Sequence, residues 1–124
     1  MRLSGKKYTL DEAVVAYRLA TANFDDPADR ATVVAKILEK LSVTDRKLFL
    51  ESIPISIVDR VTETEGLSHE FLVWCGLHPQ GSHWVEILVA RSDAPTQVLE
   101  TFANNEDIII RSKVAANPRT PGRT

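Results

Sequence analysis

The stretch DIIIRSKVAANPRTP, residues 107–121, constrains the fold more than any other part of the chain. Asp107 is a residue type that caps helix starts, and aliphatic side chains follow it at helical spacing. Asn117 precedes Pro118, and a proline disfavours the α conformation for the residue ahead of it, so the helix has to end at about Ala116. The segment therefore predicts a short amphipathic helix followed by a forced corner.

The residues on either side of this helix extend the pattern. Thr120 followed by Pro121 is typical of a new helix start. Thr120 offers a side-chain acceptor at the N-cap, and Pro121 lacks the backbone N–H that has no partner at the first helical position. Upstream stand four apolar residues, Val98, Leu99, Phe102 and Ala103. The pattern is helix, corner, helix, which defines an architecture and not an activity.

The same string resembles the repeat of the variant leucine-rich repeat family. Its units read Asp, two spacers, an aliphatic residue with Arg, two spacers, Val-Ala, a spacer, Asn-Pro, a spacer and Thr-Pro. The matching positions are Asp107, Ile110, Arg111, Val114, Ala115, Asn117, Pro118, Thr120 and Pro121. The upstream group 98–103 is similar to the family's Leu-Leu-x-x-Leu-Ala helix.

The resemblance implies alternating short helices in a right-handed superhelix, related to HEAT-like and other α-solenoids. Founding members of the family carry an iron-sulfur cluster on a separate group of cysteines. With one cysteine this chain cannot build the usual four-thiolate site, so we expect no cofactor.

A repeat buries its apolar face mainly against the next copy, so a neighbouring copy is expected. A shift of 25 residues aligns Val85, Glu86, Val89, Ala90 and Pro95 with Ile110, Arg111, Val114, Ala115 and Pro121, with one residue deleted in the corner. The upstream copy departs from the motif, since Ser92 and Asp93 replace Asn-Pro and Glu86 replaces Arg. The alternative is a chance pairing of two ordinary helical hairpins.

Length and composition fit one compact domain over residues 1–124, with a helical N-terminal part at 1–66 and a repeat-like part at 67–124. The chain has 124 residues, 44% hydrophobic and 26% charged, which excludes disordered and collagen-like classes. No apolar run is long enough to span a bilayer, and Met1 to Leu10 lacks the apolar core of a secretory signal. A lone cysteine fits a reducing compartment, so we expect a cytoplasmic protein.

Cap signals divide the N-terminal part into helices. Thr9 and Glu12 form a capping box for a helix to about Ala22, and Asp26 before Pro27 opens a second helix. The apolar stripe of the first helix comprises Leu10, Ala13, Val14, Tyr17, Ala20 and Phe24, and that of the second comprises Ala31, Val34, Ile37, Leu38 and Leu41.

Four shorter helices are expected next. One begins between Ser42 and Asp45 and includes Leu48, Phe49 and Leu50; Pro54 opens another that carries Ile55, Ile57, Val58 and Val61 and is closed by Gly66. Ser68 caps a helix to Leu77, and Gly81 with Ser82 starts one that carries Trp84, Val85, Leu88 and Val89. The predicted class is all-α, with short helices stacked as a solenoid-like α-α superhelix.

Reactive side chains concentrate between residues 69 and 83, where His69, His78 and His83 accompany Cys75 and both tryptophans. Cys75 and His78 have a spacing that metal sites use, with His83 as a third candidate ligand and Glu70 or Glu86 as a fourth. The competing interpretation is structural: corner histidines around a buried Cys75 and Trp74. A Cys-His nucleophile pair would need an activated thiolate and an oxyanion donor, for which the sequence has no signature.

These observations favour a noncatalytic module that binds a protein or peptide partner, with self-association through the C-terminal end also expected. The first alternative is a metal-binding protein or enzyme centred on Cys75, His78 and His83. The minor alternative is nucleic-acid binding through Arg111, Lys113 and Arg119, which a net charge of −2 does not favour.

Overall fold

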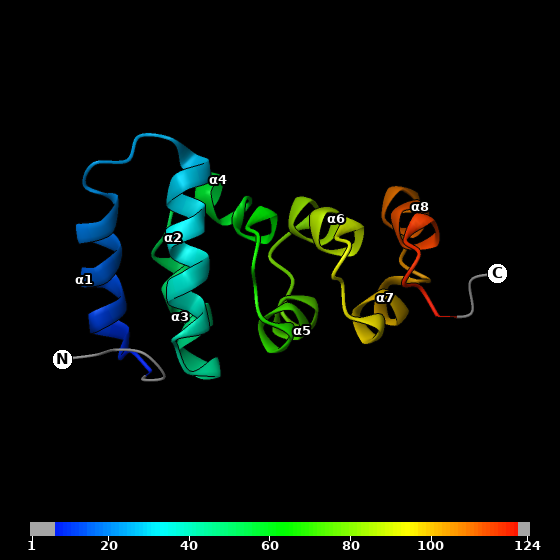
Figure 1. The fold of residues 1–124 in the computed structure, drawn as a ribbon, viewed down its shortest axis with the longest axis horizontal. Coiled ribbons are helices and arrows are strands. Elements are labelled where there is room, and N and C mark those ends of the chain that lie inside the picture. The colour runs from blue at the N-terminus through cyan, green and yellow to red at the C-terminus, as the bar shows by residue number, and fades with distance from the viewer. Residues whose placement is uncertain (1–6, 122–124) are drawn as a thin grey trace. The chain divides into compact units, whose positions relative to one another are not determined.

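The computed structural model describes residues 7–121, and this part of the chain forms eight α-helices and one 3-10 helix, without a strand (Figure 1). It divides into two compact units, one ending at Leu67 and the other beginning at Ser68. The prediction of an all-helical fold is confirmed. Across the described residues, no helix has both the length and the apolar character needed to cross a membrane.

The first unit is built around α2, Pro27–Glu39, which packs against α1, Leu10–Thr21, and against α4, Ile55–Val58, and the 3-10 helix η1, Val61–Glu63. The expected caps are present: Glu12 N–H donates to the Thr9 hydroxyl at 3.1 Å, and Ala28 N–H donates to Asp26 Oδ1 at 2.9 Å. All the predicted core residues of α2 are buried, namely Ala31, Val34, Ile37, Leu38 and Leu41.

The predicted stripe of α1 is only partly correct. Ala13 is buried and Tyr17 is half-buried, with its ring 6.3 Å from the Phe49 ring in an edge-on contact. Ala20 and Phe24 are exposed: Ala20 lines an open groove between α1 and α2, and Phe24 lies in the loop beyond the end of α1.

The third helix, α3, Val43–Glu51, packs against α1 and includes the three predicted residues 48–50. Phe49 and Leu50 are buried, but Leu48 is 51% exposed, since three consecutive residues of a helix cannot all face one side. The segment from Pro54 to Gly66 is also not one helix. It divides into α4 and η1, and Gly66 follows with a positive φ of 77°, where glycine is favoured over residues with a Cβ.

A buried arginine connects α3 to α2. Arg46 has no exposed surface, and its Nε donates to the Leu38 carbonyl, at the end of α2, at 2.8 Å. The last carbonyls of a helix have no partner within the helix, so a side chain from outside has to satisfy those that are buried. Arg46 supplies this donor, which the apolar pattern did not indicate.

We expect Arg46→Ala to lower the free energy of unfolding by about 3 kcal/mol, because it removes a charged hydrogen bond and leaves a cavity and a buried carbonyl without this donor. Urea unfolding followed by circular dichroism measures the change. The matched control is Lys47→Ala on the same helix, where the side chain is exposed and the expected change is within about 0.5 kcal/mol. Equal losses in the two variants would contradict the role of Arg46.

The second unit contains four short helices: α5, His69–Leu77, α6, Ser82–Ala90, α7, Thr96–Phe102, and α8, Ile108–Ala116. Ser68 and Asp107 cap α5 and α8 as predicted, and α8 ends at Ala116 before the Asn-Pro corner. The helices form two layers, with α5 packed on α7 and α6 packed on α8, while each helix also contacts the next along the chain (Figure 1).

Close approach between α5 and α7 depends on Gly76. A Cβ built there would lie 2.8 Å from Val98 Cγ2, which is shorter than real contacts allow. Glycine weakens a helix interior by about 1 kcal/mol relative to alanine. Gly76 is therefore best explained by interhelical packing and not by local helix preference.

Candidate functional site

The corner that follows α8 contains the last four residues of the predicted repeat motif, and we call residues 117–121 the C-terminal corner. Asn117 is 4% exposed, and its Nδ2 donates to the carbonyls of Val89, at 2.8 Å, and Arg91, at 2.9 Å. Its Oδ1 accepts from Arg119 N–H at 2.9 Å. One amide side chain thus connects the end of α8 to the end of α6.

The remaining polar residues of the corner also bind backbone carbonyls. Arg119 Nε donates to the Ala94 carbonyl at 2.9 Å, and the Thr120 hydroxyl donates to the Val114 carbonyl. Thr120 therefore closes the end of α8 in this structure. The helix that Thr120 and Pro121 are predicted to begin falls on residues after Pro121, outside the described residues.

The other motif residues have defined places in α8. Ile110 and Val114 are buried, Ala115 is exposed, and the Asp107 carboxylate accepts from Ile109 N–H at 2.9 Å. Arg111 Nη1 donates to the carbonyls of Asn105, at 2.9 Å, and Glu106, at 3.3 Å, so it holds the loop before α8.

The two proposed copies share their buried positions. At the predicted shift of 25, Val85 and Ile110 are both buried, as are Val89 and Val114. The first residues of the two helices, Ser82 of α6 and Ile108 of α8, are instead 26 positions apart in the sequence. The helix starts are therefore offset by one residue from the alignment of the buried positions. The helices α5 and α7 also share a spacing of buried residues. Phe71, Leu72 and Cys75 are buried in α5, and Val98, Leu99 and Phe102 are buried at the same spacing in α7. The sequence alone did not suggest this parallel.

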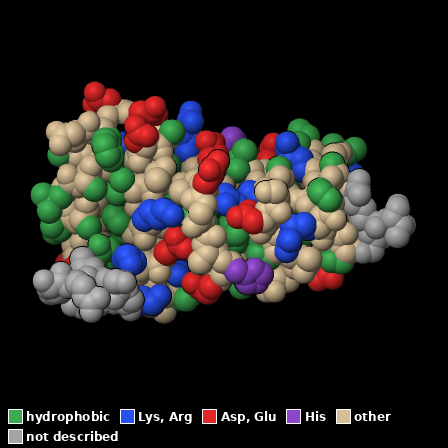
Figure 2. Space-filling model, in the orientation of Figure 1, with side chains coloured by type: hydrophobic (Ala, Val, Ile, Leu, Met, Phe, Trp, Pro, Cys, Tyr) green, Lys and Arg blue, Asp and Glu red, His purple; other side chains and the backbone are tan. Residues whose placement is uncertain are grey.

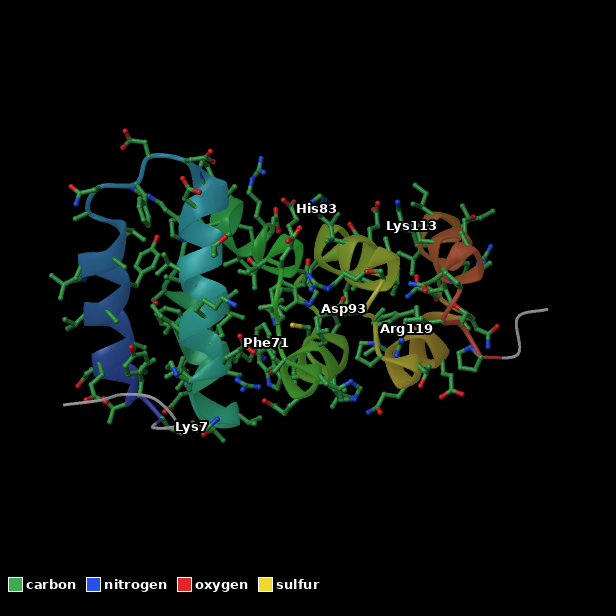
Figure 3. The ribbon with its side chains drawn as sticks, in the orientation of Figure 1. Lys7, Phe71, His83, Asp93, Lys113 and Arg119 are labelled. Carbon is green, nitrogen blue, oxygen red and sulfur yellow. The ribbon has the colours of Figure 1, made fainter. Side chains whose placement is uncertain are left out.

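The corner after α6, residues 91–95, is closed differently. In place of Asn-Pro it has Ser92 and Asp93, and the Arg91 guanidinium binds the Asp93 carboxylate through two contacts, Nε to Oδ1 at 2.7 Å and Nη2 to Oδ2 at 3.0 Å. The hydrogen bond from Arg91 lowers the pKa of Asp93, against a smaller opposing effect of burial, and the charge of Arg119 adds to the lowering. Figure 3 shows Asp93 and Arg119 close together in this region.

Between the ends of α6 and α8 lies a surface cavity of about 370 Å³. Its lining residues are Ala90, Ser92, Lys113, Ala116, Asn117 and Pro118. The floor is formed by small side chains and by the buried Asn117, and Lys113 supplies the positive charge (Figure 3). The cavity thus adjoins the corner that the motif residues hold in place.

The cysteine and histidine candidates have different environments. Cys75 has no exposed surface, as expected, and its carbonyl accepts from Trp84 Nε1 at 3.0 Å. His78 is exposed at the end of α5, with its ring 5.2 Å from the Trp74 ring, and His83 is exposed in the first turn of α6. Among residues 7–121 no group of three or more His, Cys, Asp or Glu side chains is placed to hold a metal ion.

The basic candidates are partly engaged inside the protein. Arg111 and Arg119 donate to backbone carbonyls, whereas Lys113 lines the cavity. Arg111 and Arg119 therefore each have a role within the fold, which accounts for these two residues without a nucleic-acid partner.

Comparison with protein-family models, with curated protein sequences and with solved structures finds no match to this chain.

We expect Asn117→Ala to lower the free energy of unfolding by about 2 to 3 kcal/mol, because the buried bond to the Val89 carbonyl and the partly buried bond to the Arg91 carbonyl are both lost. Asn117→Asp should be equally damaging, since a carboxylate keeps the acceptor for Arg119 N–H but cannot donate. Chemical denaturation of the full chain measures both. Asn104→Ala is the control: Asn104 is exposed, and its replacement should change stability by no more than about 0.5 kcal/mol. A stable Asn117→Asp variant would refute the role given to the amide donor.

The lowered pKa of Asp93 predicts a pH dependence. Its contribution to stability is present above the ordinary value of 3.8 and is lost as the pH falls through the lower folded-state value. Asp93→Asn should therefore reduce the loss of stability on acidification below about pH 4, and at neutral pH it should cost less than about 1 kcal/mol, since the pair is partly exposed. Unfolding curves at pH values across this range test it, with the exposed Asp25→Asn as control.

Proposed function

We propose that the chain is a noncatalytic helical-repeat module of the cytoplasm that binds a protein or peptide partner. The observation that carries the proposal is the packing of the second unit, in which α6 lies on α8, α5 lies on α7, and Asn117 joins the two corners. Stacked repeats pack in this way, since each repeat covers the apolar face of the next repeat. It supports the resemblance of residues 107–121 to the variant leucine-rich repeat.

The use of the polar side chains supports a binding role over a catalytic one. The motif residues Asn117 and Thr120 and the spacer residue Arg119 all bind backbone carbonyls, so these side chains hold the fold together. The adjoining cavity is left with small side chains, the Asn117 side chain and one lysine. A surface of this kind suits a peptide segment, because it offers shape and one charge without a set of convergent reactive groups. Catalysis by Cys75 would require a thiolate within reach of a substrate, and its sulfur lies in the core.

The end of the second unit offers a further contact surface. Ile108 is 65% exposed and Ile109 is 52% exposed on α8. Exposed aliphatic side chains next to one another favour association, and they support the proposal that this end also pairs with a second copy.

The test is capture of partners from a cell extract on the immobilised full chain, followed by their identification and a direct binding measurement. Ala116→Arg should abolish binding of a specific partner, because a long cationic side chain fills the cavity. Ala103→Arg is the matched control: the alanine is exposed at the end of α7, away from the lining residues, and binding should persist.

Loss of the partner in both variants, or in neither, would contradict a binding site between α6 and α8. A stoichiometric metal in protein purified without chelators would instead favour the alternative centred on Cys75, His78 and His83. Binding of duplex DNA that weakens steeply with salt would favour the nucleic-acid alternative.

A further inference from the structure

A second cavity, separate from the one proposed to bind a partner, lies in the first unit between α1 and α2. It has a volume of about 260 Å³ and is lined by Tyr8, Ala16, Ala20, Thr32, Val33, Lys36, Ile37 and Lys40. Its floor is apolar, and its two charged lining residues are both lysines, one helical turn apart on α2. We call this surface the α1–α2 groove.

The groove continues into exposed apolar surface on α1. Leu19 is 73% exposed and adjoins Ala16, three residues earlier on the helix surface, while Val15, four residues before Leu19, is 53% exposed and lies farther round the helix. Figure 2 shows hydrophobic side chains along α1. An apolar surface that combines a hollow with two large exposed aliphatic side chains is typical of an interaction site, whereas single exposed residues are not.

Charge is distributed unevenly along the groove. Lys36 lies in the last turn of α2 and Lys40 is its C-cap residue, and Lys7 lies at the same end of the unit, where Tyr8 N–H donates to the Lys40 carbonyl at 2.7 Å (Figure 3). Lys36 Nζ also donates to the Gly66 carbonyl at 3.4 Å, which leaves two of the three ammonium donors.

Carboxylates flank the groove at both of its ends. Asp29 lies on the same face of α2 as Lys36, two turns earlier, and the loop before α2 carries Asp25 and Asp26, where Figure 2 shows acidic side chains gathered. At the lysine end, Asp11 and Glu12 belong to the first turn of α1, where Glu12 Oε1 accepts from Thr9 N–H at 2.8 Å, and Glu39 precedes Lys40 at the end of α2. None of these carboxylates lines the cavity.

The backbone hydrogen-bonding groups of a bound polypeptide decide which conformation can bind in the α1–α2 groove. An extended peptide would bring unpaired N–H and C=O groups onto a mainly apolar floor, which costs free energy for each group. The Thr32 hydroxyl already donates to the Ala28 carbonyl at 3.1 Å, so it is no free donor for such a strand. A helix satisfies its own backbone and packs against two antiparallel helices through small residues such as Ala16 and Ala20.

We propose that the α1–α2 groove docks an acidic amphipathic helix of another protein. Its apolar face covers Ala16, Leu19 and Val33, and its carboxylates, three or four residues apart, face Lys36 and Lys40. Asp29 opposes a carboxylate at the far end of the docked helix, so charge complementarity also sets the direction in which the helix lies.

The probe is a fluorescein-labelled helical peptide of about fifteen residues, long enough to form a helix, with leucines on one face and glutamates flanking them. Fluorescence anisotropy with the full chain should show binding, and a peptide with lysine in place of every glutamate should bind at least about tenfold more weakly. In a protein amide-shift NMR spectrum, the perturbed residues should map to α1 and α2.

The paired variant Lys36→Glu with Lys40→Glu should weaken binding of the glutamate peptide by at least about tenfold, whereas Lys47→Glu, an exposed lysine on α3, should not. Because reversing Lys36 could disturb its contact with Gly66, Leu19→Glu is the second variant. Leu19 is 73% exposed, so this change keeps the core intact and should also weaken binding. Thermal unfolding confirms that each variant is folded.

Several results would overturn the proposal: no binding of the glutamate peptide, equal binding of the lysine peptide, or shifts that map away from α1 and α2. Competition of the peptide by vesicles containing phosphatidylserine would assign the groove to a membrane surface instead. A dimer broken by the paired lysine variant would assign it to a second copy. Ala116→Arg lies in the other unit and should leave peptide binding unchanged, which separates this inference from the proposed function.

Discussion

The carbonyl groups at the ends of short helices are the constraint on which this structure depends. A helix leaves its last four carbonyls without partners inside the helix, and in a nine-residue helix such as α5, α6 or α8 this is nearly half of them. The chain satisfies them with side chains. The Asn117 amide donates to the Val89 carbonyl, the Trp84 indole to the Cys75 carbonyl, and the Arg46 guanidinium to the Leu38 carbonyl. Each side chain comes from one helix or corner and binds the end of another helix.

This mechanism explains why polar residues are buried in a mainly apolar core. An asparagine or arginine in the core costs free energy unless its donors are used, and here the donors meet carbonyls that would otherwise be equally costly. Each such contact therefore fixes the position of two elements at once. The corner after α6 differs because Arg91 and Asp93 bind each other, yet the Arg91 carbonyl still accepts from Asn117.

The two units use their surfaces differently. In the second unit the motif residues maintain the stack, and the surface beside them has small side chains and Lys113. In the first unit α1 covers only part of α2, which leaves an apolar groove edged by Lys36 and Lys40. The proposed binding functions follow from surfaces that packing leaves uncovered, and neither depends on a reactive side chain.

The sequence by itself determined where helices begin and end. Thr9, Asp26, Ser68 and Asp107 cap helices where their side chains predict, and the Asn117-Pro118 pair ends α8, because these effects act within a few residues. Only the tertiary structure decided which apolar residues are covered, as Leu48 and Ile108 show, and which polar residues are buried, as Arg46 and Asn117 show. The same holds for both cavities. The physical reason is that burial and carbonyl pairing depend on which element lies opposite, and residues far apart in the chain supply that element.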